Sequence, residues 1–397
     1  MTEIVFTAAV RTGFGSFGGT LRDLSATDLA VHAGTAALAR GGFPAEAVDH
    51  VIVGNAMQTS RDAIYLARHV GLRSGLPVPT PAVTVNRLCG SGFEAVIQGA
   101  HRLLLGEAGV VLAGGTESMS QAPHVVRGAR WGIKYGPSPL LEDMLFEGLR
   151  DSHAGCAMSD TAEHLARRHG IDRAACEDYA VRSHHAAAAA WAAGVMADEV
   201  VPIPRRDRAT RTEIAWAADE HIRPNTSAES LARLPAITGP DGTVTAGTAS
   251  GINDGAAMLV MSTREKATTA GVPILGRLVS WGVAGVPPEL MGIGPVPAIR
   301  QALARGHLTL ADCDLVEVNE AFAAQYLAVE RELGLDRDRT NVHGGAIAIG
   351  HPLGASGARL TVHLLHALRQ RGGGIGIGAA CIGGGQGIAV VVEVGAA

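Results

Sequence analysis

Two kinds of apolar pattern alternate along the first 120 residues. Short continuous runs such as Ile4–Val10, Val51–Val53 and Val110–Leu112 have the length and the β-branched content of buried strands. Between the first two runs, apolar residues recur at helical spacing from Leu29 to Leu38. This alternation predicts an α/β fold with a largely parallel sheet.

The pattern changes in the middle of the chain. Between residues 121 and 248, loops containing proline, arginine and methionine surround one long helical stretch, Ala174–Ala193, and the β/α alternation resumes near Ala249. A chain of 397 residues also exceeds the roughly 250–300 at which a single core stops growing. We therefore expect an N-terminal half (1–120 plus 249–272), an inserted loop domain (121–248) and a C-terminal half (273–397).

A repeat relates the two halves. Cys89–Gly92 opens an amphipathic helix that is followed by the strand at Val110, and Gly354–Gly357 opens a similar helix that is followed by a strand at Ile375. The same offset of 265 residues relates Gly92 to Gly357 and Val110 to Ile375. The repeat predicts a pseudo-twofold pair of α/β units, with a site at their junction.

Composition excludes several classes of function. A net charge of −5 provides no basic surface for binding nucleic acid. The sequence contains no uninterrupted run of about 18 apolar residues, so we expect no membrane-spanning helix. Five cysteines without a CxxC pair favour free thiols in a reducing environment. The N-terminus, Met1–Phe6, reads as a strand rather than as a signal segment, so we expect a soluble, cytoplasmic protein.

No motif indicates a metal or a nucleotide cofactor. The sequence contains no metal-ligand spacing and no Walker-type loop. Gly13–Gly18 fits the GxGxxG pattern, but Leu21–Ser25 separates it from the first helical periodicity, whereas a dinucleotide site needs the helix to begin at the glycines. We expect no metal site and no cofactor.

Cys89 lies at a strand-to-helix turn and is followed by Gly-Ser-Gly. The N-terminus of the following helix favours a thiolate, which predicts a lowered pKa for this thiol. The alternative is a small buried apolar cysteine, which is the usual fate of a free thiol. Taken alone, the residues around Cys89 leave both interpretations open.

Three further residues occupy similar turns. Cys381 follows a predicted strand and precedes three glycines that include Gly383, His351 lies in Gly-His-Pro ahead of the second repeated helix, and Asn319 follows a buried run. Consecutive glycines cost the most backbone entropy on folding, so they fit a sharp bend or a close ligand. Each residue singly is more often structural, but the set favours an active site shared by the two halves.

Four segments resemble the signature motifs of thiolases, in the family order. They are Val85–Gly92, Asn319–Phe322, Gly344–Pro352 and Cys381–Gly385. The resemblance extends over essentially the whole chain. It implies the thiolase fold: two duplicated α/β halves that form a five-layer αβαβα core, with an inserted loop domain that binds substrate.

The resemblance also implies a mechanism. His351 would take the proton of Cys89, whose thiolate is acylated by an acyl-CoA. Cys381 would then deprotonate acetyl-CoA, and the carbanion would attack the acyl group on Cys89. One oxyanion hole would use His351 with a water held by Asn319, and the other the backbone N–H groups of Cys89 and Gly383. Coenzyme A is then a substrate and product.

The family pattern implies substrate contacts as well. Arg223, Ser230 and Ser250 match positions that contact CoA, while Met158 and Phe322 match positions that line the pocket. The loop region from Met119 to Gly132 is similar to that of short-chain, tetrameric members. We therefore expect a homotetramer, with a dimer as the alternative.

Short-chain members condense two acetyl-CoA to acetoacetyl-CoA, and we expect this acetyl-CoA acetyltransferase activity. Ala157 and His343 depart from the biosynthetic pattern, which often has His and Asn there. One alternative is a degradative 3-ketoacyl-CoA thiolase of broader or longer chain length. A ketoacyl synthase of the same fold uses two histidines with its cysteine, whereas Asn319 and Cys381 occupy the corresponding motifs here. A catalytically silent scaffold would have no use for the set of Cys89, Asn319, His351 and Cys381.

Overall fold

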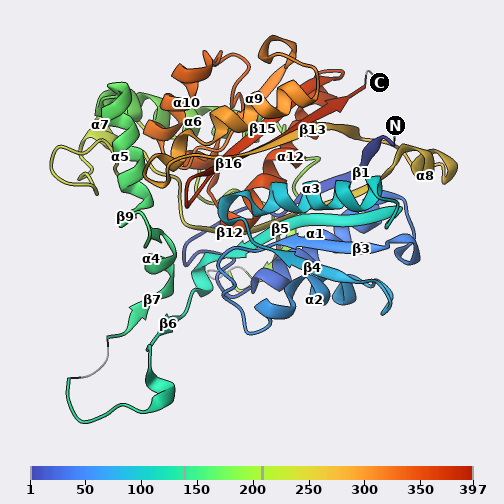
Figure 1. The fold of residues 1–397 in the computed structure, drawn as a ribbon, viewed down its shortest axis with the longest axis horizontal. Helices are drawn as coiled ribbons and strands as arrows, with labels where there is room; N and C mark the ends of the chain where they lie inside the picture. Colours follow the sequence, from blue (N-terminus) through green and yellow to red (C-terminus); the bar gives the residue numbers. More distant parts are fainter. Residues whose placement is uncertain (1, 138–139, 207–209, 396–397) are drawn as a thin grey trace.

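The computed structural model describes residues 2–137, 140–206 and 210–395 (Figure 1). Its main sheet has the strand order β14-β15-β16-β13-β1-β12-β5-β3-β4, and β2 pairs with β12. The strands are β1 (Ile4–Arg11), β2 (Gly15–Ser16), β3 (His50–Gly54), β4 (Ala82–Val85), β5 (Val110–Ser118), β12 (Asn253–Thr263), β13 (Gly276–Gly285), β14 (Leu315–Val318), β15 (Gly374–Ile382) and β16 (Gln386–Val394).

The two halves of this sheet have the same topology. In the N-terminal half β3 is parallel to β5, which is antiparallel to β12, which is antiparallel to β1. In the C-terminal half β14, β15, β16 and β13 repeat this order and these directions. The predicted duplication is therefore confirmed. The predicted largely parallel sheet is wrong, because β12, β16, β1 and β13 all join their neighbours in antiparallel fashion.

The helices complete five layers. Helices α1 and α2 cover the outer face of the N-terminal half, α9 and α10 lie on the C-terminal half, and α3 and α12 lie between the two halves (Figure 1). The helices are α1 (Ala26–Gly41), α2 (Leu66–Arg73), α3 (Ser91–Leu104), α4 (Met144–Gly148), α5 (Met158–His169), α6 (Arg173–Ala192), α7 (Ala228–Ala232), α8 (Arg264–Thr269), α9 (Pro295–Arg305), α10 (Ala323–Leu333), α11 (Ala346–Ile349) and α12 (Leu353–Gln370).

Glycines related by the repeat bring α3 and α12 together. A Cβ on Gly92 would lie 2.4 Å from the backbone nitrogen of Ala358, and a Cβ on Gly357 would lie 2.5 Å from that of Phe93. Real Cβ contacts are never so short, so any other residue would push the helices apart. The N-terminal ends of both helices, which directly follow Cys89 and His351, thereby meet at the centre of the molecule.

The middle segment packs on both halves. Leu165 of α5 and Tyr179 of α6 share a core with Ile299 of α9, whereas Ile203 packs with Leu29 of α1. The segment also contains the paired strands β6 (His124–Val125) and β7 (Glu142–Asp143), β8 (Arg150–Asp151) and β9 (Cys156–Ala157), and β10 (Ile203–Arg206) and β11 (Glu213–Trp216). The predicted three-part division of the chain stays a prediction.

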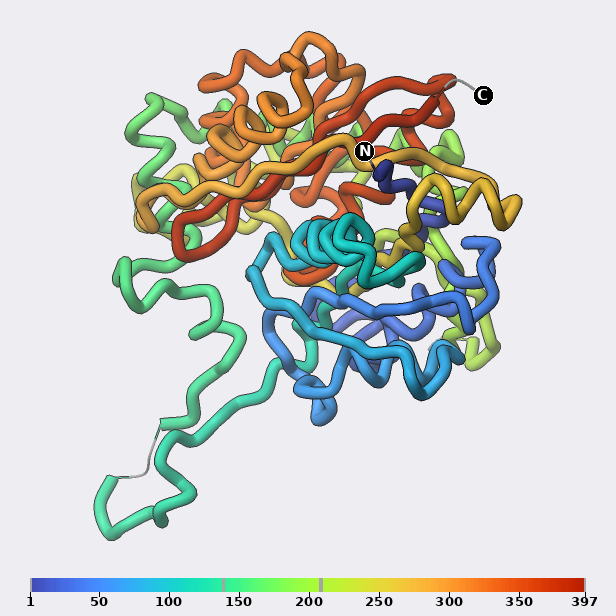
Figure 2. Tube along the Cα trace, turned by 45° about the vertical axis from the view of Figure 1, so that its right-hand side comes forward, coloured from blue at the N-terminus to red at the C-terminus, as the bar shows by residue number. Residues whose placement is uncertain are grey.

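The chain around β6 and β7 projects away from the body of the molecule (Figure 2). Trp131 lies in this projection with 83% of its surface exposed, and Tyr135 and Leu140 are exposed as well. Monomeric proteins rarely expose several large apolar side chains together.

None of the helices within the described ranges is long and apolar enough to cross a membrane.

Candidate active site

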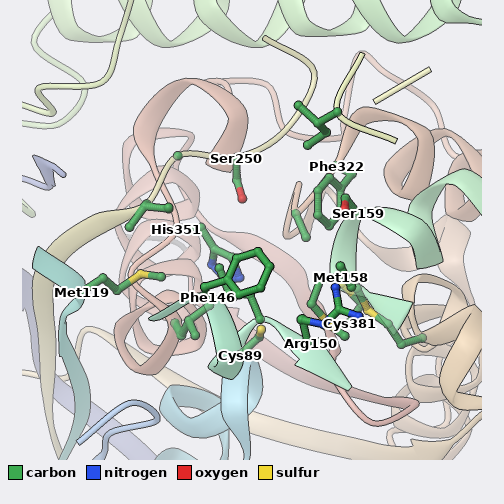
Figure 3. A pocket seen from close by; sticks show the side chains of 18 residues that line it. Cys89, Met119, Phe146, Arg150, Met158, Ser159, Ser250, Phe322, His351 and Cys381 are labelled. Carbon is green, nitrogen blue, oxygen red and sulfur yellow. The ribbon is translucent and has the colours of Figure 1, made fainter. Parts of the chain in front are cut away.

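One cavity lies where the two repeated units meet, and it encloses about 280 Å³. Cys89 reaches it from the turn before α3, His351 from the turn before α12 and Cys381 from the end of β15 (Figure 3). The other lining residues are almost all apolar: Met119, Phe146, Leu149, Arg150, Ala157, Met158, Ser159, Ile237, Ser250, Gly251, Ile252, Met291, Ala321, Phe322 and Leu353. The structure thus brings together the two cysteines and the histidine that sequence analysis singled out.

Cys89 lies two residues before the start of α3, at the turn that the sequence predicts, yet its pKa moves the other way. Burial raises the pKa of the Cys89 thiol to about 11. The backbone N–H of Gly383 acts against this rise, whereas the charge of Glu117 adds to it. The predicted lowering of this pKa is wrong, because loss of water outweighs the helix N-terminus. Cys89 therefore needs a base at the moment of reaction.

His351 is a suitable base. Its Nδ1 lies 2.6 Å from Ser356 Oγ, and that hydroxyl donates to the carbonyl of Pro352 at 2.9 Å. Since Ser356 has only one proton to give, its oxygen must accept the Nδ1–H of His351. Nε2 is then left without a proton. Burial, together with the charge of Arg359, lowers the pKa of His351 to about 4, so the ring is neutral at pH 7.

The remaining polar groups surround these three. Asn319 Nδ2 lies 3.4 Å from His351 Nε2, and Asn253 Oδ1 accepts the His351 backbone N–H at 3.0 Å. Gly383 belongs to the tight turn between β15 and β16, in which Gly384 and Gly385 have φ values of 78° and 81°. This left-handed backbone explains the run of glycines, because other residues adopt it only with strain.

Cys381 is fully buried. Burial, and then the neighbouring Cys89, raise the pKa of the Cys381 thiol well above its usual range. A buried thiol of this kind holds its proton at neutral pH. It is suited to giving that proton to a developing carbanion in the same cavity.

The predicted substrate contacts fall into two groups. Met158, Phe322 and Ser250 line the cavity with Cys89. Arg223 and Ser230 are exposed and lie outside the cavity lining, and Ser230 accepts and donates hydrogen bonds within the first turn of α7. The roles of all five stay predictions.

Several residues of the site were not predicted from the sequence. Ser356 carried a signal, since it lies four residues after Pro352 on a predicted helix and so faces back toward His351. Phe146 and Arg150 carried none, because they come from the irregular middle segment and reach the cavity only through its folding. Glu117 lies in a buried strand, where its contacts to other segments could not be foreseen.

The described residues hold no cluster of three or more His, Cys, Asp or Glu side chains that could bind a metal ion. That the chemistry needs no cofactor stays a prediction.

Two family models match the chain. The model described as "Thiolase, N-terminal domain" matches residues 4–265, and "Thiolase, C-terminal domain" matches residues 272–394. The human protein named "3-ketoacyl-CoA thiolase, mitochondrial" is 53% identical over 386 residues, covering 97% of each chain. An "Acetyl-CoA acetyltransferase" of Cupriavidus necator is 44% identical over 395 residues, covering 99% of this chain and 100% of its own.

Solved structures agree with these matches. The crystal structure of human mitochondrial 3-ketoacyl-CoA thiolase has a TM-score of 0.97 and 52% sequence identity, covering 99% of both chains. The same human enzyme in complex with CoA has a TM-score of 0.96 and 52% identity, covering 99% of this chain and 98% of its own. The predicted thiolase fold is confirmed.

The predicted cytoplasmic location is contradicted, because the relatives from human, orangutan and cattle are all named mitochondrial. The family itself follows from the matches over nearly the full length of both partners. The chain belongs to the thiolase family, and it is an acyltransferase.

Proposed function

We propose that this thiolase acts in the degradative direction, cleaving 3-ketoacyl-CoA of broader chain length with free CoA. The observation that carries this proposal is the composition of the cavity: both thiols and His351 open into a space lined almost entirely by apolar side chains. Such a lining favours an alkyl chain. The relatives support the same choice, with 53% identity to the human 3-ketoacyl-CoA thiolase against 44% to the acetyl-CoA acetyltransferase.

The first step cleaves the carbon–carbon bond. His351 Nε2 takes the proton of the Cys89 thiol as the sulfur attacks the 3-keto carbon of the substrate. The bond between C2 and C3 breaks, and the electron pair left on C2 takes the proton of the Cys381 thiol. Acetyl-CoA leaves, and the shortened acyl group stays on Cys89 as a thioester.

The second step releases the acyl group. His351 first passes the proton it took from Cys89 to the Cys381 thiolate, so both groups return to their starting states. His351 then takes the proton of the free CoA thiol as the CoA sulfur attacks the acyl-Cys89 carbonyl. Acyl-CoA is formed, and the Cys89 sulfur leaves and takes this proton back from His351. The oxyanion of each tetrahedral intermediate needs fixed N–H donors, which typically contribute about 3–4 kcal/mol each. The backbone N–H of Gly383, next to Cys89, is one candidate, and Asn319 beside His351 is another.

Coenzyme A is proposed to enter along the middle segment. The human relative has been solved with CoA bound. Ser250 lies in the cavity lining, and Arg223 and Ser230 lie on the exposed surface. A guanidinium on the surface suits a phosphate of the nucleotide end, while the apolar cavity suits the acyl end.

Thiolysis rates for a series of substrates test the proposal. We expect a medium-chain 3-ketoacyl-CoA to be cleaved with a kcat/KM at least as high as that of acetoacetyl-CoA. A clear preference for acetoacetyl-CoA would restore the acetyl-CoA acetyltransferase interpretation. No cleavage of any 3-ketoacyl-CoA, with Cys89 inert to iodoacetamide, would favour a silent scaffold.

We also propose that the protein forms a homotetramer through the projecting segment around β6 and β7. The exposed Trp131 and Tyr135 support this, because a second copy would cover them. Light scattering after size-exclusion chromatography measures the mass directly. A Trp131→Ser variant that keeps the wild-type mass would contradict this role for the segment.

A further inference from the structure

Glu117 is a fully buried carboxylate at the C-terminal end of β5. Its Oε1 accepts the side-chain N–H of Asn55 at 2.8 Å and the backbone N–H of Met57 at 3.1 Å. Its Oε2 accepts the backbone N–H groups of Ala56 at 3.0 Å and of Gly354 at 2.9 Å. Four donors therefore converge on one side chain.

The four donors come from both halves of the molecule. Asn55, Ala56 and Met57 follow β3 in the N-terminal half, whereas Gly354 lies in the first turn of α12 in the C-terminal half. Gly354 is three residues beyond His351. The carboxylate thus ties the half that carries Cys89 to the turn that carries His351.

The neighbours of these donors reach the site itself. Leu353, which precedes Gly354, lines the cavity. Met57 and Leu353 pack in one cluster with Cys89. A shift of either donor segment would therefore move atoms that touch the nucleophile.

The arrangement is costly, which argues that it serves more than stability. A buried carboxylate without a cation is expensive, and none of the ion pairs among the described residues involves Glu117, whose pKa is affected most by burial and by its hydrogen-bond donors. Burial raises the pKa of Glu117 to about 7 despite its four donors. Asn55 turns its amide nitrogen to Glu117 and to the carbonyl of Thr116, which leaves its own Oδ1 buried without a partner.

We propose that Glu117 is a positioning residue of the thiolytic site, whose carboxylate clamps residues 55–57 to the first turn of α12 and so fixes His351 relative to Cys89. The proposal rests on the proposed function for its reaction. It adds a further effect on Cys89, because a negative charge close to the thiol opposes formation of the thiolate.

Glu117→Gln tests the clamp with little change in volume. The new NH₂ group must face the N–H groups of either Ala56 and Gly354 or Asn55 and Met57, so one pair of donors loses its acceptor. We expect kcat for thiolysis to fall about 30- to 100-fold with KM within about twofold, because a small misplacement of reacting groups lowers kcat by this order.

The pH profile of Cys89 alkylation by iodoacetamide separates this role from a merely structural one. Only the thiolate reacts, so we expect alkylation of the wild-type protein to increase as the pH approaches 11. Loss of the Glu117 charge should move the midpoint to lower pH. Glu163→Gln is the matched control: Glu163 is also buried and accepts the backbone N–H groups of Thr243 and Val244, but it lies outside the cavity. Its alkylation midpoint should stay at the wild-type value.

An unchanged kcat in Glu117→Gln, or a midpoint that stays where the control has it, would overturn the proposal. Should this variant fail to fold, Asn55→Ala removes one donor and leaves the carboxylate in place. Asn55→Ala should lower kcat about five- to tenfold at unchanged KM, since one hydrogen bond to a charged group is lost. A kcat within twofold of that of the wild type would overturn the proposal. Alkylation needs no substrate, so a wild-type protein that cleaves no 3-ketoacyl-CoA would refute the proposed function while this readout still reports on Glu117.

Discussion

The floor and the cover of the cavity are built in different ways. The floor comes from the duplicated halves: Cys89, His351 and Cys381 each lie at the end of a helix or strand that both halves fix in place. The cover comes from the middle segment, whose residues Phe146 and Arg150 lie on a five-residue helix and a two-residue strand. Phe146 remains 58% exposed, whereas Cys381 is fully buried.

This difference separates chemistry from selectivity. Groups that transfer protons must be held within a fraction of an ångström, which a packed core provides. Groups that only contact an alkyl chain tolerate variation, because hydrophobic contact is not directional. Changes in the floor should therefore lower the rate for every substrate, while changes in the cover should alter the ratio between substrates.

Cys89→Ala should have the largest effect. Without the sulfur no acyl-enzyme forms, and thiolysis should fall by at least about 10⁴-fold for short and long substrates alike, as is typical when a nucleophile is removed. Intact-mass measurement after incubation with acetyl-CoA detects the acyl group on the wild-type protein. An acylated Cys89→Ala protein would show that the nucleophile lies elsewhere.

Cys381→Ala should leave acylation by acetyl-CoA intact and block carbon–carbon cleavage. Its thiol is proposed to supply a proton to the carbanion, a role usually responsible for about 10²–10⁴ in rate. Intact mass and thiolysis, measured on the same sample, separate the two steps. If this variant cannot be acylated, the division of roles between the two cysteines is wrong.

The floor is also the part that the sequence predicts best. Its strands and helices follow continuous or periodic apolar runs, and the helix predicted to open at Gly354 corresponds to α12 at Leu353–Gln370. The turns carry glycines that the backbone requires, as Gly384 and Gly385 demonstrate. What the sequence could not predict is the balance of solvation: the N-terminus of α3 is where it was expected, yet burial still raises the pKa of Cys89.

Substrate choice was harder to predict, because it too depends on how distant segments pack around the cavity. The short-chain expectation came from the resemblance of one loop region, while the cavity depends on where Phe146, Arg150 and Ile237 come to rest. These residues lie in segments without a strong helical or alternating pattern. Contacts between such segments are long-range, and the local pattern does not determine them.

Ser356→Ala tests a residue of the floor that acts on His351 through a single hydrogen bond. The hydroxyl fixes the proton on His351 Nδ1, so its loss frees the ring to rotate and to adopt the other tautomer. We expect kcat to fall about tenfold for all chain lengths, the effect of losing about 1.4 kcal/mol. Ser356→Thr keeps the hydroxyl and serves as the control. A loss confined to one chain length would contradict the comparison between floor and cover.

Phe146→Ala is the most direct test of the cover, and its effect should be confined to longer substrates. The ring of Phe146 lies over the cavity that contains Cys89 and His351 (Figure 3), and a bound alkyl chain would bury its exposed face.

At about 25 cal/mol per Å², burying some 50 Å² contributes roughly 1.3 kcal/mol, so kcat/KM for a medium-chain substrate should fall about tenfold. Acetoacetyl-CoA, whose acyl group is too short to cover the ring, should be affected by less than about twofold. Phe17→Ala provides a matched control, because Phe17 is 57% exposed against 58% for Phe146 and lies outside the cavity lining. Equal losses for both substrates would mean that the cover also positions the reacting groups, and selectivity would then have to be sought in the floor.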